Sequence, residues 1–255
     1  MNKYAFTSIA LILIMFSSMA QLKAVSYYEG TQKLNGFAAI PKKNLSGNAG
    51  ILILPAWKGI DSHAKESATK LSKLGYHAFV ADIYGEGHYP TDTKQAGEQA
   101  GYYKKNFEQY QARIRAALEQ LVKAGANPDK IVVMGYCFGG TGALEAARGN
   151  LPVKGVVSFH GGLGKDPSRS NGTPAAKILV CHGADDPYES PEEIAAFQKE
   201  MRDSKADWQM VYYANAVHAF TDPDAGTDNS KGAAYNEKAA KRSWEHFMIF
   251  LKEVL

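Results

Sequence analysis

The residue in this sequence best placed to do chemistry is a cysteine between glycines. Cys137 lies in Gly-Tyr-Cys-Phe-Gly, residues 135–139, at the end of the apolar run 130–136. This pattern is typical of a nucleophile elbow, a sharp strand-to-helix turn, here with a thiol in place of a hydroxyl. The glycines leave no side chain to collide where strand and helix approach, and the N-terminus of the following helix favours a thiolate. The pattern predicts a nucleophilic cysteine.

An acid and a histidine follow two later apolar runs. The run 177–183 leads into Ala-Asp-Asp-Pro, which contains Asp185 and Asp186, and the run 208–214 is followed by His218. Each group alone is a weak signal, because a loop histidine is more often structural or solvated than catalytic. With the cysteine they give the chain order nucleophile, acid, histidine, which indicates a catalytic triad.

The three groups have distinct expected roles. Cys137 attacks a carbonyl carbon, His218 accepts the thiol proton and later returns it, and Asp186 stabilises the imidazolium. Asp186 is preferred because it occupies the last position of His-Gly-x-x-Asp, and Asp185 is the rival acid. The alternative for Cys137 is an inert thiol buried in a tight turn, since most free cysteines pack as small apolar side chains.

An oxyanion formed by such an attack needs two hydrogen-bond donors. The backbone N–H of Phe138, directly after the nucleophile, is the first expected donor. The second is expected in the loop after the apolar run 50–55, where we choose the N–H of Trp57. The Trp57 ring fits simple core or a pocket wall equally well.

The alternation of short apolar runs with helical patterns predicts a scaffold that brings these groups together. Continuous apolar runs suit strands buried on both faces of a parallel sheet. The expected strands are 50–55, 77–83, 130–136, 153–160, 177–183 and 208–214, with an antiparallel edge strand at 34–42. The expected helices are 62–74, 93–124 with a break near Gly101, 140–148, 190–201 and 232–254. This order predicts an α/β fold, a doubly wound and mostly parallel sheet with helices on both faces, and active groups at the carboxyl ends of its strands.

The composition excludes several classes of function. The chain has 255 residues, is 45% hydrophobic and carries a formal net charge of +3, so nothing points to nucleic acid. No spacing of His, Cys, Asp and Glu suggests a metal site, and the glycine segments lack a dinucleotide fingerprint. We therefore expect no metal, no organic cofactor and no obligate protein partner.

The first 24 residues predict a secretory signal peptide. Lys3 precedes the apolar run 9–16, and small residues follow, with cleavage after Ala20 or Ala24. The run is too short to span a bilayer comfortably, so we expect no stable membrane insertion after cleavage, although an uncleaved anchor or a buried helix is the alternative. Residues 25–255 would then form one exported domain, periplasmic or extracellular, whose two cysteines we expect to remain unpaired.

Five segments together resemble the dienelactone hydrolase family of the α/β-hydrolase superfamily. They are PAWKG (55–59), ADIYGEG (81–87), MGYCFGG (134–140), HGADDP (182–187) and VHAF (217–220). The likeness runs from about residue 30 to the C-terminus. The resemblance implies an α/β-hydrolase fold and a hydrolase that needs no cofactor, with Cys137, Asp186 and His218 as its triad.

Three positions depart from the pattern of the family's founding enzymes. A glutamate that contacts the resting cysteine there is matched here by Ala56, so Cys137 must be controlled in another way, such as a direct pair with His218. Two arginines that hold a substrate carboxylate there are matched here by Glu86 and Asp222. Because acids repel a carboxylate, these departures predict a neutral or cationic ester or lactone as substrate.

Further pocket candidates follow from their places at strand ends or beside the triad. They are Tyr84, His88, Tyr136, His160 and Phe220. His160 is expected either to act as a second polar group on the substrate or to bond the backbone of the glycine-rich turn that follows it, and the sequence favours neither.

The sequence thus predicts a small-molecule hydrolase of carboxylic esters or lactones that works through an acyl-enzyme. A thioesterase or peptidase on the same scaffold is one alternative, because the triad does not determine the leaving group. A non-catalytic binding or thiol-sensing protein that keeps the fold is another. The retained acid and histidine count against it, since a sensor needs neither.

Overall fold

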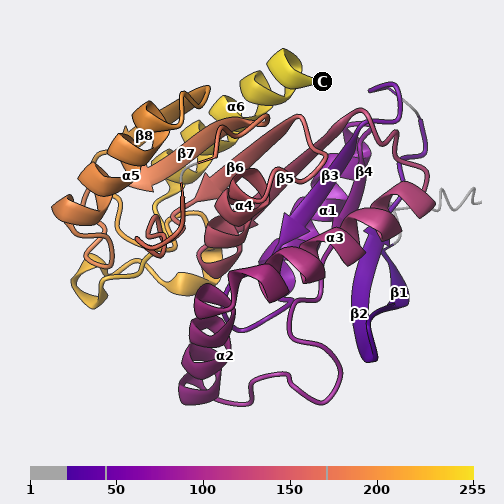
Figure 1. The fold of residues 1–255 in the computed structure, drawn as a ribbon, viewed down its shortest axis with the longest axis horizontal. Helices are drawn as coiled ribbons and strands as arrows, with labels where there is room; N and C mark the ends of the chain where they lie inside the picture. Colours follow the sequence, from indigo (N-terminus) through magenta and orange to yellow (C-terminus); the bar gives the residue numbers. More distant parts are fainter. Residues whose placement is uncertain (1–21, 44, 171) are drawn as a thin grey trace, which may run out of the picture.

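The fold is built on one eight-stranded sheet with helices on both faces (Figure 1). The computed structural model describes residues 22–43, 45–170 and 172–255. The strands are β1 (Leu22–Glu29), β2 (Gln32–Ala39), β3 (Gly50–Leu54), β4 (His77–Val80), β5 (Ile131–Tyr136), β6 (Gly155–Phe159), β7 (Lys177–Gly183) and β8 (Trp208–Tyr213). The helices are α1 (Ser62–Lys73), α2 (Thr93–Lys105), α3 (Phe107–Lys123), α4 (Phe138–Arg148), α5 (Pro191–Asp203) and α6 (Glu237–Val254), with short 3₁₀ helices at Pro223–Ala225 and Asn229–Lys231.

The strand order is β1-β2-β4-β3-β5-β6-β7-β8. The six neighbouring strands β4, β3, β5, β6, β7 and β8 run parallel, and β2 joins them antiparallel through β4. This confirms the doubly wound, mostly parallel α/β sheet that the sequence predicts. The carboxyl ends of the parallel strands lie at one edge of the sheet, and helix α2 lies beyond that edge (Figure 1).

The N-terminal edge of the sheet differs from the prediction. A single antiparallel edge strand was expected at 34–42, whereas the chain forms a hairpin in which β1 pairs with β2 along its whole length, from Leu22 opposite Ala39 to Glu29 opposite Gln32. β1 is half exposed, and Lys23 and Ser26 interrupt its apolar residues, so it lacks the apolar run by which the other strands were identified. Gly30 allows the tight turn because its φ of 56° is easily reached without a side chain.

The predicted signal peptide falls almost entirely outside the described residues, which begin at Leu22. The last three residues of that segment, 22–24, belong to β1 and pair with β2. Among the described residues, no helix is both long enough and apolar enough to cross a bilayer.

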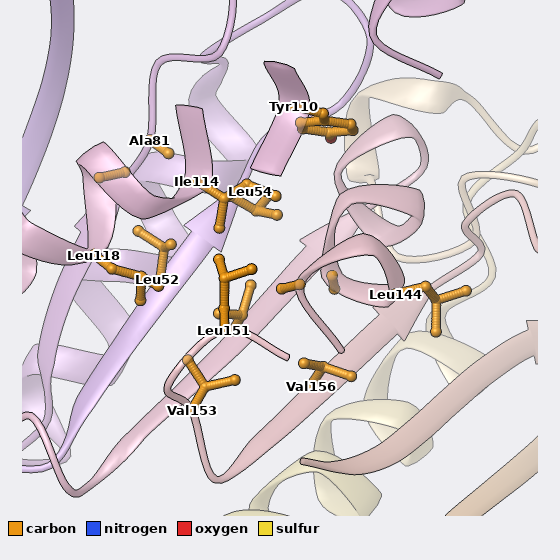
Figure 2. Close-up of a cluster of buried hydrophobic side chains, with 14 of the residues drawn as sticks. Leu52, Leu54, Ala81, Tyr110, Ile114, Leu118, Leu144, Leu151, Val153 and Val156 are labelled. Atoms are coloured by element: carbon orange, nitrogen blue, oxygen red, sulfur yellow. The ribbon is translucent and has the colours of Figure 1, made fainter. Parts of the chain in front are cut away.

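Two apolar layers pack against the sheet, one on each face. Along β3, Leu52 and Leu54 face the layer beneath α2, α3, α4 and α5, and Ile51 and Ile53 face the layer beneath α1 and α6. Figure 2 shows the first layer, in which Leu52, Leu54 and Ala81 of the sheet side meet Tyr110, Ile114 and Leu118 of α3. Burial on both faces explains why these strands read as unbroken apolar runs.

Three helix boundaries also differ from the prediction. The long pattern 93–124 is broken at Asn106, which separates α2 from α3, rather than near Gly101. Helix α4 begins at Phe138, directly after the cysteine, and α6 begins at Glu237 rather than at 232. Helix α5 starts with the predicted capping box, in which the Ser190 and Glu193 side chains each accept the other residue's backbone N–H.

Candidate active site

Cys137 occupies a strained turn between β5 and α4. Its φ and ψ are 53° and −117°, a conformation that residues other than glycine rarely adopt. The Cys137 N–H donates to the Phe159 carbonyl at 3.0 Å, and the Gly140 N–H donates to the Cys137 carbonyl at 2.9 Å. These bonds hold the thiol in front of the first turn of α4.

The glycines around the cysteine are required by close backbone contacts. A Cβ at Gly135 would lie 2.0 Å from the Gly139 carbonyl oxygen, and one at Gly139 would lie 2.1 Å from the Leu54 carbonyl oxygen. No side chain fits at either distance, and neither neighbour can move aside because both are backbone. The pattern therefore has the steric cause that the sequence predicts.

His218 and Asp186 meet at the ends of β8 and β7. The His218 Nδ1 lies 2.8 Å from the Asp186 Oδ2, and the Asp186 Oδ1 accepts the Tyr188 N–H at 3.0 Å. The Asp186 carboxylate is fully buried. Asp185, the rival acid, is exposed and does not join this pair.

The segment that carries His218 is held by a later loop. The His218 N–H donates to the Gly232 carbonyl at 3.1 Å, and the Ala234 N–H donates to the His218 carbonyl at 3.0 Å. Sequence reasoning had no signal for this contact, because residues 226–235 are polar and carry no apolar run.

The thiol of Cys137 and the ring of His218 form a coupled acid–base pair. Burial by itself would raise the pKa of Cys137, but the hydrogen bond and charge interaction with His218 outweigh it, so the pKa is lowered. The Phe138 N–H and the charge of Lys104 lower it further. Burial would lower the pKa of His218, but its hydrogen bonds to Asp186 and Cys137 raise that pKa to about 10. Both shifts favour a thiolate beside an imidazolium.

These groups line a cavity of about 490 Å³ at the carboxyl edge of the sheet, within the usual size range for small-molecule sites. It is walled by residues 56–63 after β3, by α2, by the elbow, and by the loops after β6, β7 and β8. The wall includes Cys137 and His218, so a bound molecule would meet the thiol directly.

Several predicted site residues do line this cavity. Trp57 and Phe138, the expected oxyanion donors, are both in its wall, as are Tyr136, His160 and Asp222. Ala56, which the sequence analysis matched to a glutamate of the founding enzymes, also lines it.

Four predicted pocket residues do not line the cavity. Tyr84 lies behind the wall, where its hydroxyl donates to the Trp57 carbonyl at 2.6 Å, and Phe220 is buried beneath His160 with ring centroids 5.2 Å apart. Glu86 instead pairs with Lys33 at 2.8 Å, and His88 lines a separate surface hollow beside α2. The β4–α2 loop directs both residues away from the cavity, which strand-end position alone does not reveal.

His160 bonds to a side chain rather than to the backbone of the glycine-rich turn. Its Nε2 lies 2.8 Å from the Thr221 hydroxyl, which also lies 3.1 Å from the His63 Nε2. Burial holds the pKa of His160 well below its ordinary value, so the ring is neutral. It packs edge-on against His218, with ring centroids 5.2 Å apart. His160 and His63, through their shared bond to Thr221, anchor the turn that follows His218.

The cavity also contains titratable residues that sequence reasoning missed. Asp61 and His63 enter from the start of α1, Lys104 from α2 and Glu189 from the loop after β7. Burial raises the pKa of Asp61, and it raises the pKa of Glu189 to about 7. Glu189 was within reach of strand-end reasoning, since it follows Asp186 by three residues, whereas only the packing of α2 brings Lys104 to the site.

Both cysteines are free thiols, and only Cys137 reaches the cavity. Cys181 is fully buried in β7, where burial raises its pKa to about 12. Within the described part of the chain, no three His, Cys, Asp or Glu side chains are grouped to hold a metal ion.

Comparison with curated proteins finds relatives over much of the chain. One is an uncharacterized protein of Caenorhabditis elegans, 34% identical over 148 residues, which are 55% of this chain and 91% of the relative. Another, from Bradyrhizobium, bears the name "Probable 2-oxo-3-(5-oxofuran-2-ylidene)propanoate lactonase" and is 27% identical over 213 residues, 79% of this chain and 82% of that protein.

Solved structures match more completely. One, titled m3DLH, superimposes with a TM-score of 0.87 at 33% identity, covering 92% of this chain and 98% of its own. A dienelactone hydrolase-like promiscuous phosphotriesterase from metagenomic libraries superimposes with a TM-score of 0.85 at 34% identity, with the same coverage. These neighbours confirm the α/β-hydrolase fold. The model of the dienelactone hydrolase family matches residues 34–255, and the chain belongs to that family.

Proposed function

We propose that this protein hydrolyses carboxylic esters or lactones through a Cys137–His218–Asp186 triad and an acyl-enzyme. The observation that carries the proposal is a cavity wall that contains both the Cys137 thiol and His218, with His218 bonded to the buried Asp186 carboxylate behind it. Family membership supports hydrolysis as the reaction class, and the lactonase name of the Bradyrhizobium relative supports lactones among the substrates.

The first half-reaction acylates the cysteine. The Cys137 thiolate attacks the carbonyl carbon, so an S–C bond forms and the carbonyl oxygen becomes an oxyanion. The N–H groups of Phe138 and Trp57 are the proposed donors to that oxygen. As the tetrahedral intermediate collapses, the C–O bond of the ester breaks, and the His218 imidazolium gives its proton to the leaving alkoxide.

The second half-reaction releases the acid. Neutral His218 takes a proton from water, the hydroxide formed attacks the thioester carbonyl, and the thiolate leaves. Asp186 does not exchange a proton in either step. It keeps the His218 ring in one orientation and stabilises its positive charge, which a buried neutral side chain could not do.

The charges in the cavity support a neutral or cationic substrate. Asp61 and Asp222 line the wall, and Lys104 is the opposing cation. Glu86, one of the two acids on which the sequence argument rested, lies outside the cavity and no longer contributes to it. Asp222 and the unforeseen Asp61 carry that argument instead, because a substrate carboxylate would meet both.

The same site is compatible with other leaving groups. A thioester or peptide carbonyl would undergo the same attack, and the similar phosphotriesterase shows that a relative with this fold is promiscuous toward phosphorus esters. A non-catalytic thiol-binding or thiol-sensing role fits less well, because it does not require the buried Asp186 behind His218.

Export remains part of the proposal, with cleavage of the leader after Ala20 rather than Ala24. Cleavage after Ala24 would remove three of the eight residues of β1 that pair with β2, whereas cleavage after Ala20 leaves the strand whole. Ser18 and Ala20 provide the small residues that signal peptidase requires. The mature protein would be periplasmic or extracellular.

Removing the nucleophile or the base should abolish turnover. Cys137→Ala and His218→Ala should each lower kcat/KM for a 4-nitrophenyl ester by at least about 10⁴-fold, and Cys137→Ala should also abolish the pre-steady-state burst of nitrophenol. Cys181→Ala is the control for loss of a thiol. An undiminished burst in Cys137→Ala, or no burst in the native protein across esters, lactones, thioesters and phosphotriesters, would contradict the mechanism.

The pH dependence of kcat/KM should have a broad plateau. The Cys137 thiolate persists below the ordinary thiol pKa because that pKa is lowered, and the His218 imidazolium persists up to about pH 10 because that pKa is raised. The rate should fall below the Cys137 pKa, where the thiol is protonated, and above about pH 10, where His218 loses its proton.

Alkylation of the thiol gives an independent measure of the same pair. Iodoacetamide should modify Cys137 at pH 7 roughly tenfold more slowly in His218→Gln than in the native protein, since the thiol pKa returns toward about 8.5. Cys181 should stay unmodified in the folded protein. Equal alkylation rates in the two proteins would show that His218 does not control the thiol.

The charge of the substrate should affect turnover in a defined order. Among matched esters with neutral, trimethylammonium and carboxylate tails, the carboxylate ester should be the poorest, and Asp222→Asn should improve that ester alone by about three- to tenfold. Asn preserves the cap that Asp222 makes to the Asp224 N–H, and Asp185→Asn is the control at an exposed acid. Preferred turnover of the anionic ester would refute the charge argument.

The N-terminus of the exported protein should be Gln21. Intact-mass analysis of the mature protein secreted by a bacterial host would reveal it directly. A mature N-terminus at Val25 would show that the first three residues of β1 are dispensable, and an uncleaved chain would overturn the signal-peptide assignment.

A further inference from the structure

Three polar atoms from different parts of the chain converge on one small space above Gly162, in the loop after β6. A Cβ placed on Gly162 would lie 3.0 Å from the Thr141 Oγ1, 3.2 Å from the Lys104 Nζ and 3.4 Å from the Glu189 Oε1. Gly162, Lys104 and Glu189 all line the cavity that contains Cys137. None of the three polar residues has a role in the triad.

The two charged groups face each other across this space without forming an ion pair. Glu189 is held through one oxygen, because its Oε2 accepts the Leu163 N–H at 3.0 Å. Its other oxygen, Oε1, is the one that lies near Gly162. Among the ion pairs of the described residues, none joins Lys104 to Glu189. Both groups border the cavity beside Gly162, so a molecule bound there would meet the ammonium and the carboxylate together.

A third observation also indicates an incomplete polar site. The Thr141 hydroxyl is buried, has no hydrogen-bond partner in the described structure, and is the nearest of the three polar atoms to the Cβ position at Gly162. Buried hydroxyls are nearly always paired, so an orphan close to the Lys104 ammonium and to a Glu189 oxygen marks a place where a polar partner is missing.

The chemistry of the two walls selects the kind of group. A hydroxyl can accept from the Lys104 ammonium and donate to the Glu189 carboxylate at the same time. A carboxylate would pair with Lys104 but be repelled by Glu189, an ammonium would pair with Glu189 but be repelled by Lys104, and an alkyl group would pair with neither.

We propose that Lys104, Glu189 and Gly162 form a hydroxyl-binding subsite, so that the preferred substrates are esters or lactones with a hydroxyl group on the part of the molecule that reaches the space over Gly162. The inference rests on the proposed hydrolase function, which it deepens by naming a substrate class. The raised pKa of Glu189, about 7, is consistent with a carboxyl that can accept or donate near neutral pH.

The test compares pairs of 4-nitrophenyl esters that differ only in one hydroxyl, moved stepwise along the acyl chain. For at least one position, the native protein should show a ratio of kcat/KM values, hydroxylated over plain, of about ten or more. Lys104→Met and Glu189→Gln should each lower that ratio about tenfold. Gln can still accept the Leu163 N–H, but it then presents an amide donor to the substrate in place of an acceptor.

Two further variants separate the subsite from general effects. Gly162→Ala fills the space with a methyl group and should lower the same ratio. Lys105→Met, at the neighbouring exposed lysine, should leave the ratio unchanged. The ratio is the required readout because the charge of Lys104 also lowers the pKa of Cys137, which affects both esters of a pair alike.

A binding measurement keeps the test decisive if neither ester is hydrolysed. Non-hydrolysable ethers that carry the same hydroxylated and plain chains should protect Cys137 from iodoacetamide, and the hydroxylated ether should do so at about tenfold lower concentration in the native protein but not in Glu189→Gln. Equal ratios and equal protection for every hydroxyl position would overturn the subsite and leave the hydrolase standing. Preferential protection without any turnover would keep the subsite and overturn the hydrolase.

Discussion

The close contact between the start of α4 and the ends of β3 and β5 is the constraint on which the site depends. Gly135 and Gly139 allow backbone atoms to approach within distances that any Cβ would block, and Cys137 between them adopts a positive φ. The consequence is a thiol that projects from the turn into the cavity instead of packing in the core. Cys181, in the middle of β7, shows the other outcome, a fully buried thiol whose pKa is raised.

The electrostatics of the site depend on that placement. Cys137 lies beside His218, and His218 is bonded to the buried carboxylate of Asp186. Burial therefore does not neutralise the thiol and the imidazole as it would an isolated ionisable group. The neutral His160 contributes by holding Thr221, which follows His218 by three residues, without adding a second positive charge next to the imidazolium. The strained elbow, the acid–base pair and the anchored loop therefore act as one unit.

The cavity departs from the family's founding pattern in the charges around this unit. Ala56 lines the cavity with Cys137, and the pKa of the thiol is lowered chiefly by His218. The wall carries both signs of charge, from Asp61, Asp222, Glu189 and Lys104. Of these, Glu189 and Lys104 lie on either side of Gly162. Such a wall suits a substrate with neutral polar groups better than one with a carboxylate.

The features of this protein that local physics specifies could be predicted from the amino-acid order. Unbroken apolar runs predicted the parallel strands because each strand is buried on both faces, and glycine spacing predicted the elbow because only glycine tolerates the contacts at Gly135 and Gly139. The order of Cys137, Asp186 and His218 placed them at strand ends, which parallel topology brings to one edge. The tertiary structure alone decided which neighbours face the cavity. It turned Glu86 and His88 away through the path of one loop, brought Lys104 in through the packing of α2, and paired the half-exposed strand β1 with β2. None of these outcomes has a local pattern, because each depends on contacts between segments far apart in the chain.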